Sequence, residues 1–86
     1  MNTNVHSYRV IVEKEKQEGG FAYVAYVPTL GISDFGKNID EAVKNTEKAI
    51  KLFLETLVEL KKPIPAPDSE EYFVTTSKIK IFSPTV

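Results

Sequence analysis

The chain has 86 residues, of which 42% are hydrophobic and 27% are charged, so it can form one small globular domain with a modest core. Its 11 basic and 12 acidic residues leave a net charge of −1, which excludes the strongly basic surface typical of general nucleic-acid binding. The absence of cysteine excludes a disulfide scaffold and thiolate metal sites, and no segment is long and apolar enough to span a membrane. We therefore expect a single soluble domain over residues 1–86, located in the cytoplasm.

Two strands joined by a turn are predicted near the start of the chain. Residues 5–14, VHSYRVIVEK, are rich in β-branched and aromatic residues and show the period of two of a strand. The following EKQEGG ends in Gly19 and Gly20, which suit a hairpin turn. The second strand, residues 21–27 (FAYVAYV), is apolar on both faces and ends before Pro28. A short third strand is predicted near residues 32–35.

A long amphipathic helix is predicted to begin after Asn38. This residue is a good N-cap, and Glu41 stands three positions later, as in a capping box. Apolar side chains recur on one broad face from Ile39 to Leu60, with charged side chains largely opposite. The helix is expected to end near residues 61–62, before a proline, after about 23 residues. Such a helix would cover one face of a small sheet and run the full length of the domain.

The end of the chain is predicted to return to this sheet. Residues 63–71, PIPAPDSEE, read as a stiff extended connector because proline fixes φ. Residues 72–82, YFVTTSKIKIF, are interpreted as the final strand. The predicted fold class is therefore α+β, in the order β-β-β-α-β, with a small antiparallel-type sheet and one long helix packed on one face.

This succession of elements resembles the N-terminal domain of HicB-type antitoxins, over roughly residues 8–67. The matching positions are Tyr8, Gly20, Tyr23, Ala25, Pro28, Leu30, Gly31, Gly36, Glu41, Ala42, Asn45, Ile50, Pro65 and Pro67. The resemblance implies a partial RNase H-like fold. The best-known members neutralise a small toxin ribonuclease, HicA, by covering it, and they usually carry a C-terminal DNA-binding domain. This sequence ends at Val86 without such a module, so we expect no direct DNA binding.

No residue pattern in the chain predicts catalysis. His6 is the single histidine and is interpreted as a surface residue. The RNase H-like outline raises the question of a metal-dependent nuclease, for which Glu13 and Asp34 are the candidates, whereas Asp40 and Glu41 are explained by helix capping. We expect neither an enzyme nor a cofactor or metal site, and keep a divergent nuclease as an alternative.

Apolar surface is the feature that the predicted fold leaves unexplained, because one helix covers only one sheet face. The residues predicted to form an interface are Ile11, Phe21, Tyr23, Leu52, Ile79 and Ile81. Lys78 and Lys80 are typical of an edge strand, which pairs either within its own sheet or with a second copy. The sequence does not decide between these two modes of pairing.

The leading functional hypothesis is a non-enzymatic, HicB-like antitoxin-type binding protein. It would self-associate as a dimer or higher oligomer and neutralise a small basic toxin nuclease. The alternative is an orphaned structural or ligand-sensing oligomeric domain that has no toxin partner.

Overall fold

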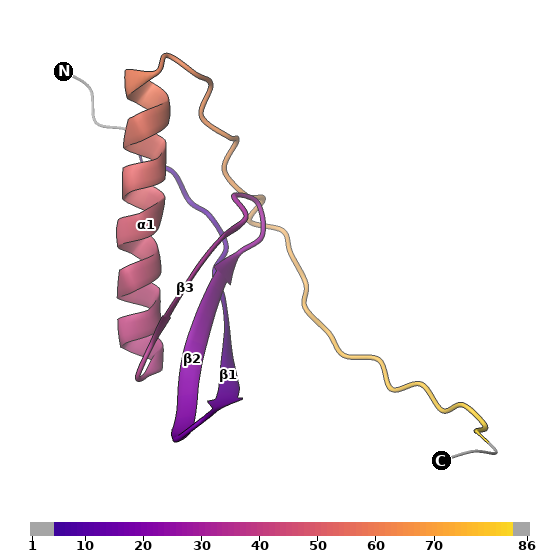
Figure 1. Cartoon of the computed structure of the whole chain (residues 1–86). Helices are drawn as coiled ribbons and strands as arrows, with labels where there is room; N and C mark the ends of the chain where they lie inside the picture. The colour runs from indigo at the N-terminus through magenta and orange to yellow at the C-terminus, as the bar shows by residue number, and fades with distance from the viewer. Residues whose placement is uncertain (1–4, 84–86) are drawn as a thin grey trace.

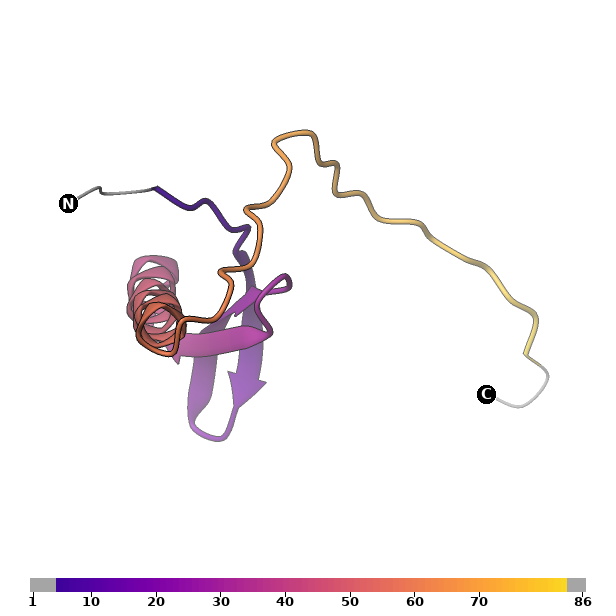
Figure 2. The same cartoon turned by 90° about the horizontal axis from the view of Figure 1, so that it is seen from above.

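The computed structural model describes residues 5–83, which form one three-stranded sheet and one helix (Figure 1). The strands are β1 (Ile11–Gln17), β2 (Gly20–Val27) and β3 (Ile32–Gly36), and they pair antiparallel in the order β1-β2-β3. The helix α1 (Ile39–Glu59) lies against one face of this sheet (Figure 2). The predicted α+β arrangement of three strands followed by a long helix is therefore confirmed.

The β1–β2 hairpin differs from the prediction in its bounds. Gln17 pairs with Gly20, so the strands continue to a tight turn at Glu18 and Gly19. At the other end β1 starts only at Ile11, and the predicted residues 5–10 are not part of it. The carbonyl of Val27, the next position of β2, accepts the N–H groups of residues 30 and 31 at 3.2 and 2.8 Å, which closes the turn between β2 and β3.

Both ends of α1 are capped by specific hydrogen bonds. The Asn38 side chain accepts the backbone N–H of Glu41 at 2.8 Å, which confirms the predicted N-cap. The Glu41 carboxylate reaches back to the N–H of Lys37 at 3.2 Å, one residue before the cap. At the other end Lys61 takes a left-handed conformation, with φ of 56°, and the N–H of residue 62 donates to the carbonyl of Leu57 at 2.9 Å. The helix therefore closes with a Schellman-type turn, slightly before the predicted end.

The core lies where the first half of α1 crosses β2 and β3. Gly36 allows this close approach, because a Cβ atom there would stand 2.5 Å from the backbone nitrogen of Ala42. Ala25, Val27 and Thr46 are fully buried. The Thr46 hydroxyl donates to the Ala42 carbonyl at 2.8 Å, so burial leaves it hydrogen-bonded. Small side chains make this core dense but limited in volume.

The second half of α1 is less completely covered than the first. Phe53 and Leu60 are exposed and Leu57 is only partly buried, although all three were predicted on the covered stripe. Residues 6–10, ahead of β1, lie beside this part of the helix and leave an open groove of about 450 Å³. The groove is lined by His6, Ser7, Tyr8, Val10, Glu47, Ile50, Lys51 and Leu54.

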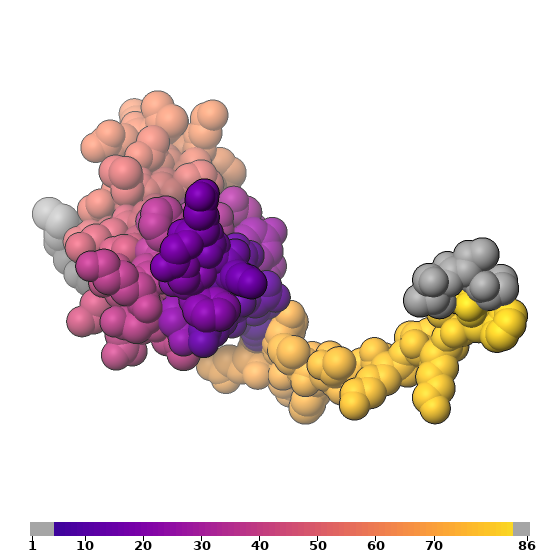
Figure 3. Space-filling view, turned by 60° about the horizontal axis from the view of Figure 1, so that its bottom comes forward, coloured from indigo at the N-terminus to yellow at the C-terminus, as the bar shows by residue number. Residues whose placement is uncertain are grey.

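The predicted final strand at residues 72–82 is not formed within the described part of the chain. Residues 63–69 return to the sheet as predicted, but the backbone then leaves the body as a single extended segment (Figures 1 and 3). We call residues 70–83 the arm and residues 65–69 its root. The arm gives the chain a longest dimension of 63 Å and a radius of gyration of 17.3 Å, whereas a compact domain of this length would have about 12 Å.

Candidate protein-binding surface

The root of the arm is fixed to the body through Asp68. Its backbone N–H donates to the Ser7 carbonyl at 3.0 Å, and its carboxylate accepts the N–H of Arg9 at 2.6 Å and the hydroxyl of Thr29. The hydrogen bonds from Arg9 and Thr29 to the carboxylate, with the nearby Arg9 charge, lower the pKa of Asp68 below its usual value of 3.8. The carboxylate therefore holds the segment before β1, the loop after β2 and the root together.

Tyr8 and Arg9 extend this attachment on either side of Asp68. The Tyr8 hydroxyl donates to the Pro65 carbonyl at 2.5 Å, and burial together with the Asp68 charge raises the pKa of Tyr8. The Arg9 guanidinium donates to the Ser69 carbonyl at 2.6 Å and lies 3.3 Å from the centre of the Tyr72 ring. The direction in which the arm leaves the body is thus set by contacts as far as Tyr72.

Beyond Tyr72 the arm carries large apolar side chains that the rest of the described chain does not cover. Phe73 is 93% exposed and Phe82 is 91% exposed, while Ile79 and Ile81 are exposed to about the same degree. In the space-filling view the arm is a thin projection from the body (Figure 3). Apolar surface of this density on a narrow segment is typical of a binding element.

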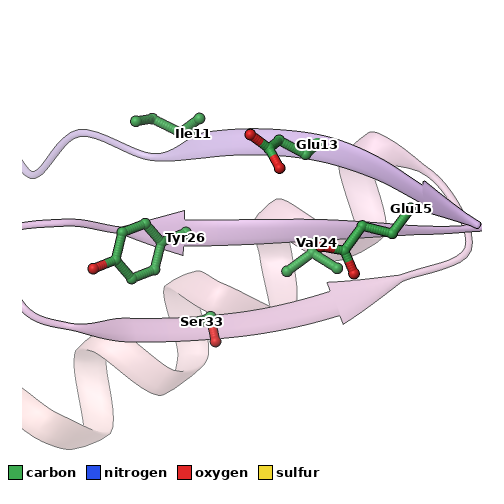
Figure 4. Close-up of a pocket in the computed structure, with 6 residues that line it drawn as sticks. All are labelled: Ile11, Glu13, Glu15, Val24, Tyr26 and Ser33. Atoms are coloured by element: carbon green, nitrogen blue, oxygen red, sulfur yellow. The ribbon is translucent and has the colours of Figure 1, made fainter. Parts of the chain in front are cut away.

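The sheet presents a second apolar surface on the side opposite α1, which we call the open face. A shallow depression of about 340 Å³ there is lined by Ile11, Glu13, Glu15, Val24, Tyr26 and Ser33 (Figure 4). Phe35 pairs with Val24, so it lies on the same face, and it is 63% exposed. Tyr26 beside it is 45% exposed. No element of residues 5–83 covers this group.

The predicted interface residues do not form one patch. Ile11 lies on the open face, and Ile79 and Ile81 lie on the arm. The other three lie elsewhere: Tyr23 is partly buried on the helix side, Phe21 is exposed near the hairpin turn under the Lys14 ammonium, and Leu52 is exposed on α1. Sequence reasoning missed Val24, Tyr26 and Phe35, although strict alternation from the tight turn would have placed the first two on one face.

The structure does not assemble the nuclease candidates. Glu13 lines the open face, whereas Asp34 pairs with the buried Ala25 and so belongs to the helix side of the sheet. Asp40 and Glu41 lie in the first turn of α1, and His6 stacks beside Tyr8 with ring centres 6.5 Å apart. Within residues 5–83 no cluster of three or more metal-ligating side chains occurs. Nor does that part of the chain contain a helix long and apolar enough to cross a membrane.

Comparison with known proteins supports the resemblance seen in the residues. The family described as the HicB-like antitoxins of bacterial toxin-antitoxin systems matches residues 8–81. The chain is also 35% identical over 65 residues to the UPF0150 protein ssr1765 of Synechocystis sp., an alignment that covers 74% of this chain and 78% of that protein. No solved structure was found to match. The chain therefore belongs to the HicB-like antitoxin family.

Proposed function

We propose that this protein is a non-enzymatic antitoxin that self-associates and neutralises a small basic ribonuclease toxin of the HicA type by covering it. The toxin would bind the open face of the sheet. We expect the protein to act in the cytoplasm.

The observation that carries this proposal is the uncovered apolar group on the open face. An antiparallel sheet commonly has one apolar face on the core and one polar face in water, but here Val24, Tyr26 and Phe35 occupy the outer face. Two exposed aromatic rings beside an aliphatic residue have the composition of a binding hot spot. Family membership supplies the class of partner, because an antitoxin acts on a toxin.

A co-expression experiment with the toxin encoded beside this gene tests the proposal. The wild-type chain is expected to co-purify with the toxin in a fixed ratio and to suppress cleavage of a labelled RNA. The double variant Tyr26→Asp/Phe35→Asp should weaken the complex by roughly 30-fold or more, since one hot-spot aromatic contributes about 2 kcal/mol. Both side chains are exposed, so the fold should survive, which circular dichroism checks.

Leu52→Asp is the matched control, because Leu52 is an equally apolar and exposed residue that lies on α1. It should bind and inhibit the toxin like the wild type. Inhibition by the double variant at wild-type concentrations would exclude the open face as the toxin-binding surface. Absence of any complex with the wild-type chain would favour the orphaned structural or ligand-sensing domain.

A further inference from the structure

We propose that the arm of each chain adds as a fourth, antiparallel strand to the free β1 edge of a second copy, so that two chains exchange arms in a symmetric dimer. Arm exchange rests on the self-association in the proposed function, but not on toxin binding.

The arm has the composition of a β-strand but does not pair with the sheet of its own chain. It contains the β-branched and aromatic residues favoured in strands, and its backbone is extended over residues 70–83. Its apolar side chains are exposed on both sides, from Phe73 at one end to Phe82 at the other. An extended segment of this kind gains main-chain hydrogen bonds and burial when it adds to an exposed sheet edge.

The β1 strand offers the more accessible of the two sheet edges. It pairs only with β2, and its side chains from Glu13 to Gln17 are exposed. The β3 edge is different, because α1 packs against that strand at Gly36. In addition, the Asn45 side chain of α1 already donates to the Phe35 carbonyl at 2.8 Å. An incoming strand therefore finds free backbone groups along β1.

Charge decides which side of the arm faces which side of the sheet. Lys78 and Lys80 project from one side of the arm by strand alternation. On β1, Glu13 and Glu15 lie on the open face (Figure 4). Lys14 and Lys16 lie on the other face by strand alternation. The arm lysines therefore belong on the open face, beside the two glutamates, because a one-residue slip would set lysine against lysine.

An antiparallel alignment satisfies the charges and sets two of the apolar arm residues against apolar residues of β1, while Ile79 falls opposite Lys14. It pairs Lys78 with Glu15 and Lys80 with Glu13, and it then sets Phe82 opposite Ile11. The neighbouring pair, Ile81 opposite Val12, falls on the helix side, where the groove lined by Val10, Ile50 and Leu54 is open. A parallel alignment that kept the charge pairs would instead set Ile81 against Lys16.

The direction of the arm identifies the second copy as its source. Within one chain the root is hydrogen-bonded to Ser7 and Arg9, just before the first residue of β1. An arm that leaves from this point could follow its own β1 only in the parallel direction. Continuing the offset of the Ser7–Asp68 contact would bring Lys78 to Gln17 and Lys80 past the end of β1. Neither lysine would meet Glu13 or Glu15. An antiparallel arm comes naturally from a partner related by a two-fold axis.

Engineered disulfides test the arrangement directly, because the chain has no cysteine of its own. In the full-length double variant Glu13→Cys/Lys80→Cys, oxidation should give a covalent dimer on a non-reducing denaturing gel, since opposed antiparallel residues have Cα atoms about 4.5–5.5 Å apart. The matched pair Glu13→Cys/Val74→Cys reports on parallel pairing with the chain's own β1, and it should remain uncrosslinked. A closed monomer from either variant would overturn arm exchange.

Charge reversal gives a second readout by light scattering of the chain without toxin. The wild type should be a dimer, and Lys78→Glu/Lys80→Glu should raise its dissociation constant at least about tenfold, because four cross-strand attractions become repulsions. Adding Glu13→Lys/Glu15→Lys to the same chain should restore the dimer, whereas Lys48→Glu on α1 should have no effect. A monomeric wild type, or no restoration, would refute the proposal.

Adding toxin afterwards separates the two proposals. A dimer that does not bind the toxin would support arm exchange and refute the antitoxin role. A monomer that binds the toxin would refute arm exchange and support the antitoxin role.

Discussion

The first half of α1 and the arm differ in how far the chain itself covers their side chains. Where α1 crosses β3, Ala42 and Thr46 are completely buried, and the approach is so close that only glycine fits at position 36. On the arm, Phe73 and Phe82 are both more than 90% exposed. The first half of α1 has therefore completed its packing within one chain, and the arm has not.

The difference shows that alternation alone does not make a strand. Residues 21–27 and residues 72–82 both have the composition of strands, but β2 has β1 and β3 on its two sides while the arm has neither. Backbone N–H and C=O groups need partners, and for the arm solvent supplies them until another edge is available. The strands of the sheet are thus paired within one chain, whereas the arm is not.

Gly36→Ala should give the largest loss in the body. The added methyl group would stand 2.5 Å from the Ala42 nitrogen and 2.8 Å from the Glu41 carbonyl carbon, so the helix would have to move away from β3. We expect the free energy of unfolding to fall by about 3 kcal/mol, at the upper end for overpacking, as measured by urea titration. Ser33→Ala, on the exposed side of the same strand, is the control and should change little. A tolerated Gly36→Ala would mean that the helix does not pack this closely.

Asn38→Ala should give a smaller loss in the body. It removes the acceptor for the Glu41 N–H at the start of α1, and loss of an N-cap costs about 1 kcal/mol. Asn38→Ser keeps a capping oxygen and should recover most of the stability. Equal losses from both substitutions would show that position 38 matters for a reason other than capping.

Local signals explain which parts of this structure could be predicted from sequence. The cap at Asn38, the turn at Gly19 and the end of β2 before Pro28 each depend on residues within a few positions of one another. The root could not be predicted in this way, since Ser7 meets Asp68 and Tyr8 meets Pro65 across almost the whole chain. No periodicity marks such pairs.

The open face was predicted to exist, but its members were only partly identified. Because β2 is apolar on both sides, its composition does not tell which side α1 covers, and Tyr23 was selected where Tyr26 is the exposed residue. The two-residue turn at Glu18 and Gly19 fixes the β1–β2 register, and with it the parity of every side chain. Of the predicted interface residues on the sheet, only Ile11 lies on the open face.

Asp68→Asn should affect the root rather than the core. The pKa of Asp68 is lowered in the folded chain by the Arg9 N–H and the Thr29 hydroxyl, so the ionised form favours the attached root. This contribution is fully present above the usual pKa of 3.8 and is lost as the pH falls through the lower, folded value. The variant should therefore be less stable than the wild type at neutral pH, and the difference should shrink in acid as the pH falls below the usual pKa of 3.8. Urea titrations of both proteins at neutral pH and in acid measure this difference in stability. A difference that does not shrink in acid would show that the carboxylate charge is not the cause.

Ile79→Ala/Ile81→Ala should have the smallest effect on the body, and this makes it the sharpest test of the contrast. Both side chains are exposed and no covering contact would be lost within one chain, so unfolding of the monomer should change by less than about 0.5 kcal/mol. The result should depend on protein concentration. At high concentration the wild type gains stability from dimerisation, because a partner that binds only the folded chain shifts the equilibrium, and the variant should lose that gain. Thermal unfolding across a dilution series distinguishes the two regimes. A variant already less stable at the lowest concentration would mean that the arm packs on its own body in solution.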